Sequence, residues 1–358
     1  MGKKILVINP GSLSTKIAMY EDEEKLWGEE IEHSLEELKK YPHILDQVDM
    51  RDALIEKAVE EKGYKLTDLD AVMSRGGPFA RVQSGAYEIN EAMLHRMRTN
   101  PIDQHASNTG MAIAYAIAQR VGVKAYIYDA ITVDETIPVV RVVGMKCMER
   151  RGQGHNLNMR AAALRLCDEK GWDYRGKTIL VAHLGGGITL SLHLNGRIVD
   201  IISDDEGPFS PQRAGGLPNF QLINLCFEEG MTKSEVLRRF QKVGGWIDLL
   251  GTTDRREVER RIDAGDEYAA LVYEAMALSV AKNLAKLSVV ANGKVDAIIL
   301  TGGIAHAERF TDMVRERVEF IAPVTVYPGE REMEALARGC LRVLRGEEEA
   351  KIYEDKEV

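Results

Sequence analysis

The stretch ILVINPGSLST at residues 5–15 returns in outline as ILVAHLGGGIT at residues 179–189. Both copies carry the same apolar triplet, a glycine six positions after its first residue (Gly11 and Gly185), and a threonine four positions further on. Each copy predicts an apolar strand, a turn rich in small residues, and a second strand. Such a turn exposes backbone N–H groups without bulky side chains, which suits phosphate oxygens. The repeat therefore predicts a duplicated domain with a polyphosphate held between the two halves.

Length and composition limit the class of protein. A chain of 358 residues exceeds a usual single core and predicts two domains. A net charge of −9 argues against a nucleic-acid or anionic-membrane surface. No apolar run is long enough to span a membrane and no signal peptide is evident, so we expect a cytoplasmic protein. Four cysteines without CxxC spacing predict buried, reduced thiols and neither disulfides nor a zinc site: Cys147, Cys167, Cys226 and Cys340.

Strands and helices alternate along the chain, which predicts a mixed sheet covered by helices in each half. The strand-like runs are 3–9, 15–20, 69–74, 125–129, 178–184, 188–194, 197–203, 296–301 and 322–327. The helical patterns are 50–62, 109–121, 156–170 and 266–291. The acidic end, 346–358, is expected to be frayed or solvated.

Polar residues follow several of the predicted strands. Asn9, Arg75, Asp129 and His183 each close an apolar run, and Thr301 precedes a further pair of glycines. In open α/β sheets ligands bind at this end of the strands. A single polar residue after a strand is usually a turn former, but five of them at the same structural position favour a binding site.

Other histidines and arginines have a structural and a functional interpretation. His105 precedes a helix and either caps it, satisfies local backbone or contributes to a site, whereas His155 lies in a polar, Gly-rich loop where a core role is not expected. Arg213 lies in the rigid loop EGPFSPQRAGG. Asp254 and Arg255 lie at a predicted helix start, where a helix cap and a nucleotide contact are equally open.

Missing motifs narrow the chemistry further. The chain has no GxxxxGK[ST], no GxGxxG that opens a helix, no HExxH and no GxSxG. The planar guanidinium groups of Arg75 and Arg213 suit a phosphoryl group because they pair with oxyanions bidentately. What remains is phosphoryl transfer supported by backbone turns, arginines and a metal ion.

Nine segments between residues 3 and 345 together resemble one family. They are INPGSLSTK at the start, SRGG (74–77), HASNTG (105–110), YDAITVDE (128–135), AHLGGGI (182–188), DEGPFSPQRAGGLP (205–218), LGTTDRREV (250–258), LTGGIAH (300–306) and PGEREMEALA (328–337). On these segments the chain is similar to the butyrate kinase branch of the acetate kinase family, within the sugar kinase, Hsp70 and actin superfamily. The segment HASN, where acetate kinases have an HNP-type segment, and GPFSPQR favour the butyrate branch.

The resemblance implies an α/β fold of two duplicated ribonuclease H-like, actin-like ATPase domains, with mixed sheets flanked by helices and a nucleotide cleft between them. It places an acyl- and phosphoryl-side domain at residues 1–147 plus 334–358, with a returning C-terminal helix, and a nucleotide-binding domain at 148–333. The implied reaction is reversible transfer of the ATP γ-phosphoryl group to a short-chain carboxylate with Mg²⁺, giving an acyl phosphate and ADP. A homo-oligomer is implied as well.

The resemblance also implies roles for single residues. Arg75 and Arg213 would bracket the transferring phosphoryl group, and His155 would donate a hydrogen bond to it. Asp129 would orient the acyl carboxylate or the metal, and His105 would lie near the substrate. Mg²⁺ would be held by Asn9 and Glu332, with Glu334 as the alternative. The implied ATP-binding positions are Asn9, Gly11, Ser12, Ser14, Thr15, Lys16, His183, Gly185, Gly186, Gly187, Asp254, Arg255, Gly302 and Gly303.

The chain departs from the family's sequence pattern at two places, and three alternative functions remain open. Leu13 replaces a small hydroxyl residue of the first turn, and GQGHNLN around His155 replaces an aromatic-His-Ala segment. An acetate or propionate kinase of the same family, a kinase acting on a hydroxyl group such as a sugar, and a non-catalytic ATP-binding switch remain open.

Overall fold

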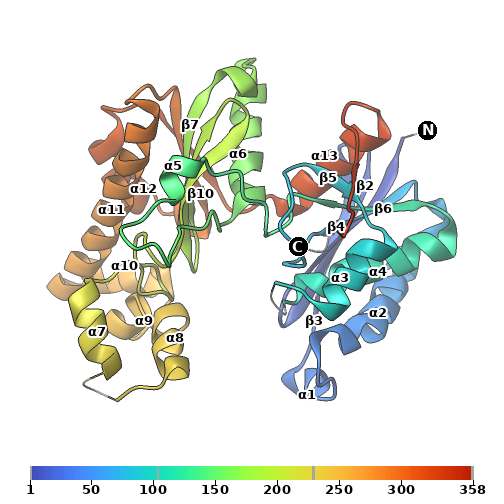
Figure 1. Cartoon of the computed structure of the whole chain (residues 1–358), viewed down its shortest axis with the longest axis horizontal. Coiled ribbons are helices and arrows are strands. Elements are labelled where there is room, and N and C mark those ends of the chain that lie inside the picture. The colour runs from blue at the N-terminus through green and yellow to red at the C-terminus, as the bar shows by residue number, and fades with distance from the viewer. Residues whose placement is uncertain (1, 103–104, 228–229, 356–358) are drawn as a thin grey trace. The chain divides into compact units, whose positions relative to one another are not determined.

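A computed structural model describes residues 2–102, 105–227 and 230–355. The chain divides into two compact units, which are treated separately below (Figure 1). The first unit comprises Met1–Asp134 and Arg331–Val358, and the second comprises Glu135–Glu330. The chain therefore enters the second unit once and returns to the first at its C-terminal end.

The first unit is built on a seven-stranded sheet with the order β12-β5-β6-β4-β1-β2-β3. Strand β1 is antiparallel to β2 and parallel to β4, and β4 is parallel to β6. Its strands are β1 (Lys4–Pro10), β2 (Ser14–Glu21), β3 (Glu24–Glu32), β4 (Ala71–Arg75), β5 (Ala86–Glu88), β6 (Lys124–Tyr128) and β12 (Lys351–Ile352).

The second unit is built on a five-stranded sheet with the order β11-β10-β7-β8-β9. Strand β7 is antiparallel to β8 and parallel to β10, and β10 is parallel to β11. This order and these directions match β6-β4-β1-β2-β3 of the first unit, so the duplication predicted from the repeated stretch is confirmed. Its strands are β7 (Thr178–Leu184), β8 (Ile188–Leu194), β9 (Arg197–Ile202), β10 (Ala297–Gly302) and β11 (Val324–Pro328).

Helices cover both faces of the first sheet (Figure 1). On β1, Leu6 and Ile8 pack into the same apolar cluster as residues of α2 and α4. Helix α13 contacts β1, β4 and β6 and buries Leu336 and Cys340. The helices of this unit are α1 (Leu35–Leu38), η1 (Ile44–Gln47), α2 (Val48–Glu61), η2 (Leu66–Asp68), α3 (Glu91–Thr99), α4 (Ser107–Val121) and α13 (Glu332–Leu344).

The second sheet is covered in the same way, because side chains alternate along each strand. Leu180 and Leu184 of β7 pack with α11 and α12, while Ile179 and Val181 pack with α6 on the opposite face (Figure 1). The helices of this unit are α5 (Pro138–Arg141), α6 (Asn156–Lys170), η3 (Tyr174–Gly176), α7 (Asn219–Phe227), α8 (Lys233–Gln241), α9 (Trp246–Leu250), α10 (Arg255–Asp263), α11 (Glu267–Ser288), η4 (Val289–Ala291), η5 (Gly303–His306) and α12 (Glu308–Val318).

The chain leaves the first unit earlier than the expected boundary at residue 147. The Glu135 carboxylate pairs with Arg160 at 2.5 Å and accepts a hydrogen bond from the Ile198 N–H. The Ile137 N–H donates to the Val199 carbonyl at 3.0 Å. These contacts bind the segment after Asp134 to the second unit. The roles expected for the two domains stay predictions.

Two sequence expectations differ from the structure. Residues 346–355 are exposed or partly exposed, as expected of a solvated end, but they are not frayed, because β12 pairs with β5 and the Glu348 carboxylate accepts the Ala86 N–H. Residues 356–358 lie outside the described residues. Cys147 is exposed and Cys226 is partly exposed, so only two of the four thiols are buried. No helix in the described part of the chain is long and apolar enough to cross a membrane.

Candidate functional site

The first unit places the turn of the first repeat directly after Asn9. Pro10 pairs with Thr15, and the four residues 11–14 form the turn between them. The Gly11 N–H donates to the Ser14 carbonyl at 2.7 Å, and Ser12 and Leu13 are exposed. Asn9 pairs with Lys16, so these two side chains lie on the same face of the sheet. The turn therefore presents Ser12 and the larger, apolar Leu13 to solvent beside a polar strand end.

Three predicted residues meet beside this turn. Glu332 Oε2 accepts one hydrogen bond from Asn9 Nδ2 and another from Arg75 Nη1, both at 2.9 Å. Asn9 and Glu332 are both buried. Glu334 instead pairs with Arg331 and Arg338. The structure thus brings Glu332, and not Glu334, to the end of β1.

Behind the turn lies Arg51, which the sequence analysis did not single out. Its side chain is 0% exposed, and Nη1 donates to the Gly11 carbonyl, the Ser14 carbonyl and Thr15 Oγ1. Thr15 Oγ1 also bonds His33 Nε2 at 2.8 Å, so its hydroxyl is engaged on the buried side. One sequence signal was available, since Arg51 precedes Ile55 by four residues and shares its apolar helix face.

The other predicted residues of the first unit have local partners. Asp129 has a positive φ of 41°, and its Oδ1 accepts the Gly85 N–H at 2.8 Å. His105 is exposed, and its Nδ1 accepts the Ser107 N–H at 3.1 Å at the start of α4. His105 thus satisfies a local backbone N–H, whereas the N-cap of α4 is Ala106. The predicted contact of His105 with substrate stays a prediction.

The second unit places three glycines at the corresponding turn. Leu184 pairs with Ile188, which leaves residues 185–187 between the strands. The Gly185 N–H donates to the Gly187 carbonyl at 3.1 Å. A Cβ on Gly187 would lie 2.9 Å from Cζ of Arg213, so the guanidinium rests against bare backbone. Arg213 also forms an ion pair with Asp204.

Two predicted histidines stack beside this turn. The rings of His155 and His183 lie 3.8 Å apart between centroids at an interplanar angle of 9°. His155 Nδ1 bonds Thr189 Oγ1 at 2.9 Å. His183 Nδ1 bonds the Asn158 amide at 2.9 Å, and its Nε2 lies 3.3 Å from Glu330. Both rings are therefore held in fixed orientations, and Asn158 and Glu330 are partners that the sequence analysis missed.

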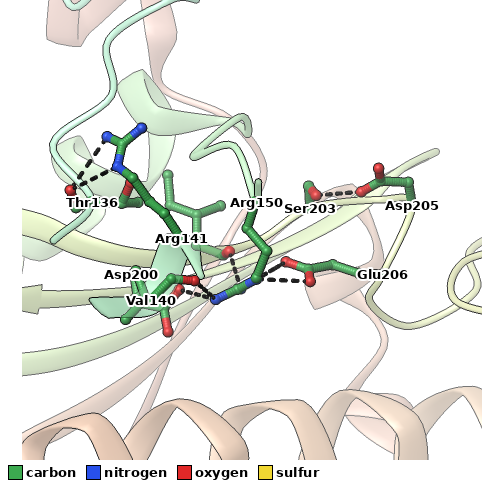
Figure 2. A network of polar contacts seen from close by, with 9 residues as sticks. Thr136, Val140, Arg141, Arg150, Asp200, Ser203, Asp205 and Glu206 are labelled. Carbon is green, nitrogen blue, oxygen red and sulfur yellow. Dashed lines mark hydrogen bonds and ion pairs between the residues drawn. The ribbon is translucent and has the colours of Figure 1, made fainter. Parts of the chain in front are cut away.

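Arg150 lies at the centre of a network of polar contacts that includes Glu206, as Figure 2 shows, and Glu206 begins the loop EGPFSPQRAGG. The Arg150 guanidinium donates to Glu206, to Asp200 and to the Val140 carbonyl. Burial alone would lower the pKa of Arg150, but its hydrogen bonds and charge interactions with Glu206 and Asp200 raise it above the usual value. The start of the Arg213 loop is thus fixed to β9 by a charged network.

The expected nucleoside residues fall into two groups. Asp254 accepts the Arg256 N–H at 2.9 Å as the N-cap of α10, so the capping interpretation is realised. Arg255 pairs with Glu259 one turn along the same helix. Asp254 and Arg255 therefore both have structural partners within α10, and their contact with the nucleoside stays a prediction.

The two glycines after β10 differ in their surroundings. Gly302 has a φ of 91°, and a Cβ there would lie 2.5 Å from the Leu184 carbonyl oxygen. A Cβ on Gly303 would have no heavy atom within 4 Å. Gly302 is therefore required by the backbone, while Gly303 leaves open space in which a flat ligand could approach.

The residues at the end of β1 fit a magnesium ion that binds together with phosphates. No group of three or more His, Cys, Asp or Glu side chains that could hold a metal occurs among the described residues. Mg²⁺ usually takes one or two carboxylates and completes its shell with water and phosphate oxygens. The Glu332 carboxylate and the Asn9 amide supply oxygens of the right kind.

Comparisons with known proteins show which family and which structures this chain is similar to. The model described as the Acetokinase family matches residues 165–331. Butyrate kinase 2 of Clostridium acetobutylicum is 43% identical over 352 residues, which cover 98% of this chain and 99% of the relative. Probable butyrate kinase 2 of Caldanaerobacter subterraneus is 43% identical over 351 residues, with coverage of 98% and 99%. The crystal structure of Porphyromonas gingivalis acetate kinase matches with a TM-score of 0.81 at 20% identity, covering 96% of this chain and 100% of that one.

Proposed function

Because this chain belongs to the acetokinase family, we propose that it catalyses the butyrate kinase reaction. The γ-phosphoryl group of ATP passes reversibly to a short-chain fatty acid carboxylate, giving an acyl phosphate and ADP. The observation that carries this proposal is the 43% identity with butyrate kinase 2 over nearly the whole length of both chains.

The acceptor needs no general base, because a carboxylic acid is already ionised at neutral pH. The barrier comes instead from the repulsion between the carboxylate and the triphosphate. Fixed cations and hydrogen-bond donors aimed at the transferring group reduce this repulsion and stabilise the charge on its equatorial oxygens. The two units supply such groups from different elements.

In the first unit, Arg75 supplies a guanidinium for the phosphoryl oxygens, and the 11–14 turn supplies backbone N–H groups. Glu332 and Asn9 would hold Mg²⁺, which would neutralise phosphate charge. The hydrogen bonds of Glu332 to Asn9 and Arg75 support this role, because they fix the carboxylate beside the turn. Asp129 orients the acyl carboxylate or the metal.

In the second unit, the glycines at 185–187 supply N–H groups to the phosphates, and Arg213 supplies a second guanidinium. His155 donates a hydrogen bond to the transferring group, and its stacking on His183 supports this by fixing the ring. Gly303 leaves room for the nucleoside, and Asp254 and Arg255 line it.

The preferred acyl chain needs a direct measurement, because one methylene changes the discrimination between two acids by only about 1–3 kcal/mol. The decisive experiment is an ATP-dependent hydroxamate trap across straight and branched acids from C2 to C6. We expect the highest kcat/KM with butyrate or a branched C4–C5 acid. A maximum at acetate would favour the acetate or propionate kinase alternative. No acyl phosphate with any acid would overturn the reaction itself.

We also propose a cytoplasmic homo-oligomer. Free thiols at all four cysteines support a reducing compartment. Exposed aromatic side chains on α7, Phe220 at 85% and Phe227 at 80%, support contact between copies. Sedimentation of the wild type and of Phe220→Ser tests the oligomer, and identical monomer masses would contradict it.

A further inference from the structure

The Arg51 guanidinium holds the backbone of the first turn from its buried side. Nη1 donates to the Gly11 and Ser14 carbonyls at 3.1 Å each, and Nη2 donates to the Ser12 carbonyl at 3.4 Å. A single side chain thus donates hydrogen bonds to the carbonyl groups of three of the four turn residues. Because C=O and N–H point in opposite directions across a trans peptide, carbonyls drawn inward leave N–H groups directed outward.

The remaining donors of Arg51 meet only uncharged groups. Nε and Nη2 donate to Gln47 Oε1 at 3.1 and 2.9 Å, and Nη1 donates to Thr15 Oγ1 at 2.8 Å. No carboxylate of the described residues lies within ion-pair distance of Arg51, and the neighbouring Asp52 pairs with Arg120. Burial lowers the pKa of Arg51, but a guanidinium keeps its proton in proteins.

A buried charge is costly unless an opposite charge or several hydrogen bonds compensate it. Here hydrogen bonds satisfy the donors of Arg51, but its positive charge stays uncompensated by any anionic side chain. That charge lies directly behind a turn whose N–H groups suit a phosphate oxygen. If Arg51 had only a structural role, a carboxylate at the position of Gln47 would stabilise its buried guanidinium as well as the amide does, or better.

We propose that Arg51 is a positioning residue for phosphate at the 11–14 turn, and that its missing carboxylate partner is part of this role. It fixes the orientation of the turn amides and adds an unpaired positive charge that attracts the terminal phosphate of ATP. The inference rests on the proposed kinase function, because it assigns the turn to the transferring phosphoryl group.

The sharpest test is Gln47→Glu. A glutamate can still accept the hydrogen bonds from Arg51 Nε and Nη2, but it neutralises the guanidinium. We expect an equal or higher midpoint of thermal unfolding together with a kcat/KM for ATP that is about tenfold lower. The Kd for ATP is expected to rise about tenfold, whereas the Kd for ADP, which lacks the terminal phosphate, stays within about twofold.

Two matched controls separate this effect from general changes in α2. Ala53→Glu adds the same negative charge on the exposed side of the helix. Arg120→Ala removes the ion pair that ties α2 to α4 through Asp52, without any contact to the turn. Both controls are expected to keep the ATP-to-ADP ratio of Kd within about twofold of the wild type.

Arg51→Lys and Arg51→Met complete the series. Lysine keeps the charge but loses the forked geometry, so the ATP-to-ADP ratio should shift less than with methionine. If Arg51→Met does not fold, Gln47→Glu still decides the matter. An unchanged ratio in Gln47→Glu, or an equal change in Ala53→Glu, overturns the proposal. Nucleotide binding is measured without turnover, so a wild type that phosphorylates no acid would overturn the proposed reaction and leave this test intact.

Discussion

The two turns of the repeated element have similar sequences but differ in length by one residue. Residues 11–14 separate Pro10 from Thr15, whereas residues 185–187 separate Leu184 from Ile188. Because neighbouring residues of a strand point to opposite faces, this single residue changes the face on which the shared threonine lies.

The consequence is visible in the partners of the two threonines. Thr15 lies opposite Pro10 and bonds Arg51 and His33 on the buried side. Thr189 lies opposite His183 and bonds His155. The first turn is therefore supported from behind by a cation, while the second supports a histidine beside the glycines. One residue of turn length thus gives the equivalent threonines of a duplicated element different partners.

The largest effect is expected when the arginine beside either turn is removed. Arg75→Ala and Arg213→Ala should each lower kcat about 10³-fold, because each removes a guanidinium from a phosphoryl group that gains charge in the transition state. The measurement is kcat for acyl phosphate formation, with circular dichroism as the control for folding. If either variant kept wild-type turnover, the proposed role of the arginine beside that turn in the reaction would be contradicted.

The next largest effect is expected at two carboxylates, each of which contacts a residue next to one of the two turns. Glu332 contacts Asn9 in the first unit, and Glu330 contacts the corresponding His183 in the second. Glu332→Gln should lower kcat about 10²-fold and raise the Mg²⁺ concentration needed for half-maximal activity, since it removes the proposed metal carboxylate.

Glu330→Gln is the matched variant. It should change kcat less than about tenfold and leave the Mg²⁺ requirement unaltered, because its partner is an imidazole. Equal losses in the two variants, or a shifted Mg²⁺ requirement in Glu330→Gln alone, would contradict the assignment of the metal to the first turn.

The glycines after β10 test the backbone around the second turn. Gly302→Ala places a Cβ against Leu184 at a positive φ, so we expect a loss of about 2–4 kcal/mol in the free energy of unfolding. Gly303→Ala should leave stability within about 0.5 kcal/mol but raise the KM for ATP, because its Cβ enters open space. Thermal unfolding and nucleotide kinetics check both expectations. A loss of stability in Gly303→Ala with an unchanged KM for ATP would mean that the space beside Gly303 serves folding and not nucleotide binding.

The sequence predicted the duplicated hairpins because their apolar strands and Gly-rich turns are local patterns. It also named Glu332 and Arg75, although their meeting with Asn9 depends on α13 returning to the first sheet, which no local pattern reveals. Arg51 was missed because a single arginine in a helical pattern is usually solvated. The strands β5 and β12 were missed because they have only 3 and 2 residues, too few to give an alternating pattern, and β12 moreover pairs across more than 260 residues of sequence, from Tyr87 to Lys351.

The smallest expected effect is the dependence of stability on pH, which involves one buried histidine in each unit. Burial, with a smaller contribution from the charge of Arg51, lowers the pKa of His33. Burial, and then Arg160, lowers the pKa of His193 well below its usual value. The folded state therefore keeps both rings neutral at pH values where the unfolded chain, with a histidine pKa of about 6.5, already binds protons.

It follows that this stability is fully present above about pH 6.5 and decreases as the pH falls toward the folded-state pKa values, by at most about 1.4 kcal/mol per pH unit for each histidine. His33→Gln can keep a hydrogen bond to Thr15 but does not titrate, so its free energy of unfolding should decline less steeply than that of the wild type between pH 6.5 and 5. Urea unfolding at intervals of half a pH unit measures both slopes. Thr15 Oγ1 bonds both His33 and Arg51, and glutamine at position 33 no longer titrates, so the double variant His33→Gln, Arg51→Met should show no further change in slope. Parallel curves for wild type and His33→Gln would mean that His33 is already protonated in the folded state, and that the cation behind the first turn is not the only charge there.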